Sequence, residues 1–151
     1  MEMVKTQADI QIFNQTELEL PVSLATFKKI ASLITEKEKC GFKLLEVVYV
    51  DEDKILKINE EHLSHDYVTD IITFRYDDDD QEIEGTLFCC ASRIFEQANE
   101  LGESPEKEFL RIYIHGLLHL VGYKDKTDPQ KQQMTAKENT YLELIEQQTS
   151  S

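Results

Sequence analysis

Two histidines, a glycine and an aspartate stand at a spacing that could place three ligands around one metal ion. They occur in the stretch HGLLHLVGYKD, which covers residues 115–125. Residues four apart on an α-helix share one face, so His115 and His119 can direct imidazole nitrogens at the same point. Gly122 can end that helix in a left-handed conformation, and the returning chain would bring Asp125 to the same point. Two imidazoles, one carboxylate and an open position are typical of zinc that catalyses hydrolysis.

The histidines belong to a segment that is apolar almost all round, which predicts a helix packed inside a domain. The apolar positions are Phe109, Leu110, Ile112, Tyr113, Ile114, Leu117, Leu118, Leu120 and Val121. Unpartnered imidazoles in such surroundings would cost about 1–3 kcal/mol each. A metal ion would satisfy one nitrogen of each ring. A pair of buried, hydrogen-bonded histidines is the alternative interpretation.

The ligand spacing is also similar to that of metzincin-type zinc peptidases, in which a glycine turn and a third ligand follow two helical histidines. In the peptidases, a glutamate directly after the first histidine acts as the general base. This chain has Gly116 at that position. The spacing therefore favours a zinc hydrolase, whereas Gly116 disfavours peptide hydrolysis.

The chain as a whole is acidic and has the length of one domain. Its 151 residues include 30 acidic and 16 basic side chains, which gives a formal net charge of −14. A chain of this length can bury a core without a structural metal, so we expect a bound metal to be catalytic. The acidic charge disfavours a general phosphate-backbone binder. Any nucleic-acid contact must therefore be local, and charges are nearly balanced around the histidine motif.

The cysteine pattern and the lack of long apolar runs predict where in the cell the protein is located. Cys40, Cys89 and Cys90 lack the paired spacing of a zinc site, and reduced thiols in or near the core fit a cytoplasmic setting. The sequence shows no long apolar run and no charged start followed by an apolar stretch. We therefore expect a cytoplasmic protein without a membrane span, a secretory signal or a membrane partner.

Strand and helix patterns mix without strict alternation, which predicts an α+β fold with a mixed, roughly four-stranded sheet and the histidine helix at its centre. We expect a single domain over residues 1–151, with a disordered tail from about residue 147. The expected strands cover residues 9–14, 44–50, 70–76 and 84–91. The expected helices run from Pro21 to near Gly41, over 51–63 and 92–101, from Ser104-Pro105, and from Asp128-Pro129.

Three segments resemble the YbeY family of bacterial metal-dependent endoribonucleases, which act in ribosomal RNA maturation. The string HGLLHLVGY at 115–123 looks like the family signature. Asn59, Asp66 and the stretch TDIITF at 69–74 are similar to its N-x6-D-x-x-TDVLSF segment, and Met134 with Glu138 matches its M-x-x-x-E element. The resemblance covers about residues 59–144. It implies a zincin-like fold, one zinc ion, a cytoplasmic location and a single-stranded RNA substrate, with ribosomal RNA precursors and ribosomal particles as partners rather than DNA.

The chain departs from the family pattern at three positions. Asp125 stands in place of a third histidine, and a carboxylate is also a good zinc ligand. Leu63 stands in place of an arginine, which could hold a phosphate in bidentate fashion as leucine cannot. Thr86 stands where the family often has aspartate. The first departure leaves metal binding credible, whereas the second either removes RNA cleavage or moves phosphate binding to another group.

Several residues are candidates for the remaining roles. His65 or Asp70, from the segment that resembles the family's stretch, would orient water or substrate as catalytic residues. Arg75 and Arg111 are the predicted substrate-binding residues, with His62 and His65 as further replacements for the family arginine. Each of these can equally be a surface residue or an ion-pair partner.

Three hypotheses follow. The first is a zinc-dependent, single-strand-specific endoribonuclease in ribosomal RNA maturation and ribosome biogenesis, with His115, His119 and Asp125 as ligands of one Zn²⁺ ion. The second is a zinc-dependent peptidase or other amide hydrolase. The third is a non-enzymatic ribosome-assembly factor that retains the zinc site.

Overall fold

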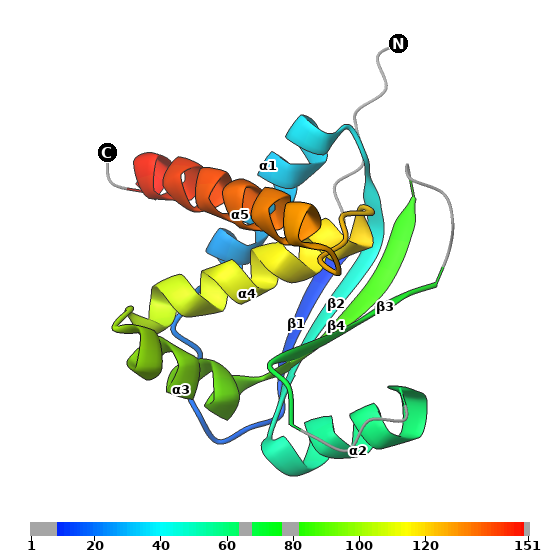
Figure 1. Cartoon of the computed structure of the whole chain (residues 1–151), viewed down its shortest axis with the longest axis vertical. Coiled ribbons are helices and arrows are strands. Elements are labelled where there is room, and N and C mark those ends of the chain that lie inside the picture. Colours follow the sequence, from blue (N-terminus) through cyan, green and yellow to red (C-terminus); the bar gives the residue numbers. More distant parts are fainter. Residues whose placement is uncertain (1–8, 64–67, 77–81, 150–151) are drawn as a thin grey trace.

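The computed structural model describes residues 9–63, 68–76 and 82–149 of the chain. Four strands form one sheet in the order β1-β2-β4-β3. Their bounds are β1 (Asp9–Asn14), β2 (Phe42–Val50), β3 (Ile71–Arg75) and β4 (Ile83–Cys90). β1, β2 and β4 run parallel, and β3 pairs with β4 in the antiparallel direction. The predicted mixed four-stranded sheet is confirmed (Figure 1).

Helices cover both faces of the sheet. Their bounds are α1 (Leu24–Glu38), α2 (Glu52–Leu63), α3 (Ala91–Leu101), α4 (Pro105–Leu120) and α5 (Asp128–Thr149). Figure 1 shows α4 crossing one face of the sheet, with α1 and α5 packed against α4, and α2 on the opposite side of the sheet. Among the described helices, none combines the length and the apolar character needed to cross a membrane.

Strand β2 is apolar at consecutive positions because both of its faces are covered. Successive side chains of a strand point to opposite faces of the sheet. Val47 and Tyr49 belong to the larger core under α4, whereas Val48 and Val50 belong to a smaller core under α2. The sheet is therefore a middle layer, and the larger core lies between it and α4.

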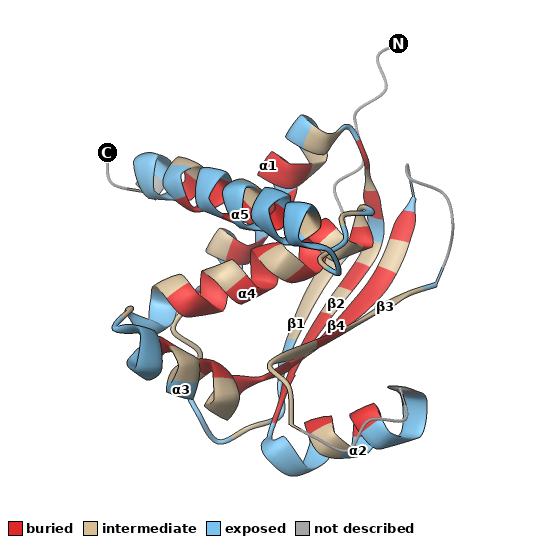
Figure 2. Cartoon of the chain, viewed as in Figure 1, coloured by how far each residue is buried: buried red, intermediate tan, exposed pale blue. Residues whose placement is uncertain are grey.

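Helix α4 is the central helix of the fold, as the sequence predicts. Ser104 caps its start, and the Ser104 side chain accepts a hydrogen bond from the Lys107 backbone nitrogen at 3.1 Å. Figure 2 shows α4 buried or half-buried along most of its length, whereas the outer face of α5 is exposed. The close fit to the sheet occurs at Gly116, where an added Cβ would lie 2.7 Å from Ile71 Cδ1 and 3.0 Å from Leu87 Cδ1.

Helix ends differ from the predictions by a few residues. α1 begins at Leu24 rather than directly after Pro21, because the Ser23 side chain accepts a hydrogen bond from the Thr26 backbone nitrogen at 3.2 Å and acts as the cap. α5 continues to Thr149, past residue 147 where the tail was predicted to become disordered. Glutamines at 147 and 148 are good helix formers and extend it. The three cysteines are buried free thiols, as expected.

Candidate metal centre

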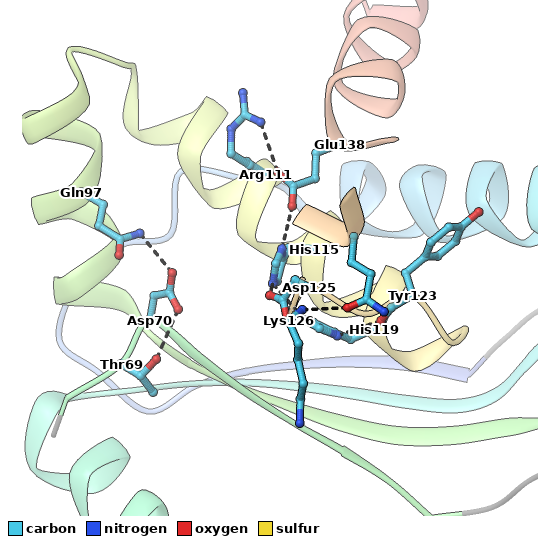
Figure 3. A network of polar contacts seen from close by, with 11 residues as sticks. Thr69, Asp70, Gln97, Arg111, His115, His119, Tyr123, Asp125, Lys126 and Glu138 are labelled. Atoms are coloured by element: carbon cyan, nitrogen blue, oxygen red, sulfur yellow. Dashed lines mark hydrogen bonds and ion pairs between the residues drawn. The ribbon is translucent and has the colours of Figure 1, made fainter. Parts of the chain in front are cut away.

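The two helical histidines and Asp125 meet near the C-terminal end of α4 (Figure 3). His115 Nε2 lies 3.1 Å from His119 Nε2, and each of these nitrogens lies 3.4 Å from Asp125 Oδ2. Ligand atoms about 2.0–2.2 Å from a tetrahedral zinc ion lie about 3.3–3.6 Å from one another. The three side chains are thus arranged as a group that can hold a metal ion.

The hydrogen bonds of the two Nδ1 atoms determine that Nε2 is the atom of each histidine available to a metal ion. His115 Nδ1 donates to Glu138 Oε2 at 2.6 Å, and His119 Nδ1 donates to the Tyr123 carbonyl oxygen at 3.0 Å. Because a carbonyl or carboxylate oxygen can only accept, both Nδ1 atoms carry a hydrogen. In neutral rings both Nε2 atoms then carry lone pairs, which face each other and the Asp125 oxygen. Such a cluster requires a cation, either a proton or a metal ion.

The electrostatic surroundings of His115 favour positive charge. Burial alone lowers the pKa of His115, but the hydrogen bond to Glu138 and the charges of Glu138, Asp125 and Asp70 outweigh it and raise that pKa above its ordinary value. The same negative groups would stabilise a metal ion at this point.

Glu138 links the centre to α5 and to Arg111. Its Oε1 accepts from Arg111 Nη1 at 3.3 Å, and Arg111 Nη1 also donates to Asn139 Oδ1 at 3.1 Å. The Glu138 side chain is only 9% exposed, so this ion pair is shielded from water. Among the predicted substrate-binding residues, Arg111 therefore has a protein partner beside the metal centre. The sequence pointed to Glu138 only through the M-x-x-x-E element, not to its contact with His115.

Asp70 lies in a neighbouring polar network between β3, α3 and α4 (Figure 3). Gln97 Nε2 donates to Asp70 Oδ2 at 3.2 Å and to Glu108 Oε2 at 3.3 Å, and Thr69 Oγ1 donates to Asp70 Oδ1 at 3.5 Å. Glu108 is buried, and burial raises its pKa despite the opposing effects of Arg111 and Gln97. Sequence reasoning missed Gln97 and Glu108, although a glutamate on an otherwise apolar helix face was a usable signal.

The remaining candidate residues lie on or beside β3 and β4. Arg75 Nη1 donates to the Leu120 carbonyl oxygen at 2.9 Å and so joins β3 to the end of α4. The His62 ring lies edge-on to Phe74, with centroids 5.5 Å apart. Thr86 is buried, and its hydroxyl accepts from Tyr76 and donates to Glu46. His65 lies outside the described residues. Phosphate binding by Arg75 or Arg111 stays a prediction.

The environment of Gly116 bears on peptide hydrolysis. A Cβ at this position would point at Ile71 and Leu87 of the sheet rather than into open space. A glutamate there would therefore meet packed apolar side chains. The peptidase base is absent, and a side chain at this position would have to displace the ends of Ile71 and Leu87.

Two histidines on a helix that crosses a mixed sheet, joined by an aspartate from the loop that follows, form the arrangement of a metal-dependent hydrolase. Comparison with known proteins gives the particular family. The chain matches the family described as Endoribonuclease YbeY over residues 9–146, and it belongs to that family.

Individual relatives agree with this assignment. Proteins named Endoribonuclease YbeY include one from Chloroherpeton thalassium, 41% identical over 118 residues that cover 78% of this chain and 83% of the relative. Another, from Chlorobium limicola, is 40% identical over 133 residues that cover 88% and 90%. The solution structure of TM1509 from Thermotoga maritima matches with a TM-score of 0.62 and 28% identity, over 90% of this chain and 88% of that one. The family resemblance predicted from the sequence is confirmed.

Proposed function

We propose that the protein is a zinc-dependent endoribonuclease that cleaves single-stranded RNA in ribosomal RNA maturation. Its family membership makes it a hydrolytic nuclease that acts on RNA. The proposal assigns one zinc ion to His115 Nε2, His119 Nε2 and the Asp125 carboxylate. The observation that carries it is the meeting of two lone-pair-bearing nitrogens and a carboxylate oxygen at 3.1–3.4 Å.

Each neighbouring residue has a defined task in this proposal. When bound, zinc would supply a Lewis acid that polarises a phosphoryl oxygen or lowers the pKa of a water molecule. Glu138 holds the ring of His115, and the Tyr123 carbonyl holds the ring of His119. Asp125 gives the site a less positive charge than a third histidine would.

Asp70 is the proposed group that orients water or substrate, with His65 as the other candidate. Gln97 and Thr69 both donate to the Asp70 carboxylate, so its oxygens are held in a fixed direction. A carboxylate held in this way can accept a proton from an attacking water.

Arg75 and Arg111 are the proposed phosphate contacts in place of the family arginine. A guanidinium presents five N–H donors in a planar fork that suits the oxygens of a phosphate. We further propose that ribosomal RNA precursors and ribosomal particles are the partners and that the protein acts in the cytoplasm. A ribosome-assembly factor without nuclease activity is the second candidate, favoured by Leu63 and the acidic charge.

The proposal is tested by cleavage of an end-labelled, single-stranded ribosomal RNA precursor fragment. Zinc-loaded wild type and His119→Ala prepared identically would be compared, with duplex RNA and DNA of the same sequence as further controls. We expect cleavage of the single-stranded RNA by the wild type alone. If neither protein cleaves although zinc in the wild type is verified, the nuclease proposal is contradicted. Complementation of a deletion by His119→Ala would then support the assembly factor.

A further inference from the structure

The third proposed ligand lies on a loop and not on a helix. Asp125 belongs to the segment between α4 and α5, and its side chain is 37% exposed. The loop is anchored at its far end, where the backbone nitrogens of Lys126 and Thr127 both donate to Gln130 Oε1 at 3.0 Å. At its near end, the Tyr123 backbone nitrogen donates to the Leu118 carbonyl at 3.0 Å. The position of Asp125 depends on both anchors.

A half-buried carboxylate on helix α1 holds the near end of the loop. Glu38 is the last residue of α1, and its side chain is 11% exposed. Glu38 Oε1 accepts from the Tyr123 hydroxyl at 2.7 Å. Glu38 Oε2 accepts from the Tyr141 hydroxyl at 2.6 Å and from Lys137 Nζ at 3.2 Å, both on α5. One carboxylate thus joins α1, α5 and the loop that carries Asp125.

Tyr123 connects this carboxylate to the candidate metal centre. Its hydroxyl binds Glu38, while its carbonyl oxygen accepts from His119 Nδ1. Lys137 Nζ also lies over the Tyr123 ring, 5.6 Å from its centroid. Tyr123 is therefore held by a cation–π contact as well as by the hydrogen bond of its hydroxyl. Any movement of Tyr123 would shift both the acceptor for His119 and the loop that reaches Asp125.

We propose that Glu38 is a positioning residue of the metal centre, which acts through Tyr123 to fix the His119 ring and the Asp125 loop. The inference rests on the proposed zinc site. A hydrogen bond to an ionised carboxylate is stronger than one between neutral groups, so Glu38 is a firm anchor for the tyrosine hydroxyl. Residues that orient metal ligands from outside typically change metal affinity by about 10–100-fold when they are replaced.

The test uses two matched tyrosine variants, because replacing Glu38 would disturb Tyr123, Tyr141 and Lys137 at once and could prevent folding. Tyr123→Phe and Tyr141→Phe each remove one hydroxyl that donates to Glu38 and leave the ring in place. Only Tyr123→Phe removes the hydrogen bond between Glu38 and the loop that carries Asp125. Zn²⁺ affinity of the full chain would be measured by competition with a chromophoric chelator, and thermal unfolding of the metal-free proteins would be measured alongside.

We expect both variants to unfold at a lower temperature than wild type. Tyr123→Phe should bind Zn²⁺ about tenfold more weakly, and Tyr141→Phe within about twofold of wild type. Equal Zn²⁺ affinity in all three proteins, or an equal loss in both variants, would overturn the positioning role. Failure of the wild-type chain to bind Zn²⁺ would instead overturn the zinc proposal, and this inference with it.

Discussion

At the scale of single residues, the candidate centre depends on the different partners of the two ring nitrogens of each histidine. Nδ1 of each ring donates a hydrogen bond to an oxygen of the protein. Nε2 of each ring points toward the other histidine and toward Asp125. A hydrogen-bonded pair of histidines, the alternative interpretation of the sequence, accounts for the Nδ1 contacts and, with one added proton, for the contact between the two Nε2 atoms. The convergence of both Nε2 atoms on a carboxylate favours a metal ion.

Asp125 is the proposed ligand that most distinguishes this chain from the family pattern. Asp125→Ala should weaken Zn²⁺ binding at least tenfold, because one of the three proposed protein ligands is lost. Asp125→His restores the family's ligand type and should bind Zn²⁺ within about tenfold of wild type. Chelator competition measures both. Unchanged Zn²⁺ affinity in Asp125→Ala would contradict the assignment of this ligand.

The half-buried Glu38 and the buried Glu108 should give opposite dependences of stability on pH. The pKa of Glu38 lies below its ordinary value of 4.5, because hydrogen bonds from Tyr141, Tyr123 and Lys137 outweigh the effect of burial. Its contribution to stability is therefore present above pH 4.5 and lost as the pH falls through the lowered pKa. The pKa of Glu108 is raised by burial above 4.5, so ionisation of Glu108 costs stability as the pH rises through the raised value.

Thermal unfolding between about pH 3 and pH 8 of Glu38→Gln and Glu108→Gln would check these signs. The deficit of Glu38→Gln relative to wild type should shrink at the acid end. Glu108→Gln should gain stability relative to wild type at the alkaline end. Differences from wild type that are constant over the whole range would contradict both assignments.

At the scale of elements, the contact of α4 with β3 and β4 sets the position of the histidines relative to the sheet. Gly116→Ala brings a helix-propensity gain of about 1 kcal/mol against an overpacking penalty of about 1–3 kcal/mol. We expect a net loss of up to about 2 kcal/mol in the free energy of unfolding, measured by urea denaturation. Ile71→Val removes the Cδ1 atom that lies 2.7 Å from the added Cβ and should recover part of that loss in the double variant. If Gly116→Ala were more stable than wild type, α4 would be able to move away from the sheet, and the close contact at Gly116 would not fix its position.

The sequence predicted those parts of the site that depend on local spacing. His115 and His119 are one helical turn apart, and Asp125 follows the helix end closely, so their meeting could be predicted from helix geometry. Glu138 reaches His115 across 23 residues, and Glu38 reaches Tyr123 across 85. Such contacts depend on how α1, α4 and α5 pack, which hydrophobic periodicity does not specify. The sheet was predicted because its strands are rich in β-branched and aromatic residues, whereas its strand order was not.

At the scale of the whole molecule, the acidic charge opposes nonspecific RNA binding. A net charge of −14 leaves only local basic groups to contact phosphates. For single strands, each neutralised phosphate contributes about −0.7 to the slope of log affinity against log salt concentration. If two or three phosphates are contacted, the slope should be no steeper than about −2 in a titration of uncleaved RNA with His119→Ala. A much steeper slope would indicate an extended basic surface, contrary to this account.

The central claim is that His115, His119 and Asp125 hold one zinc ion. It is tested most directly by zinc K-edge X-ray absorption of the zinc-loaded protein, together with its metal content. We expect one zinc ion per chain, with two imidazole ligands and the remaining ligands oxygen, at about 2.0–2.2 Å. No bound zinc, or sulfur ligands at about 2.3 Å from the cysteines, would contradict it.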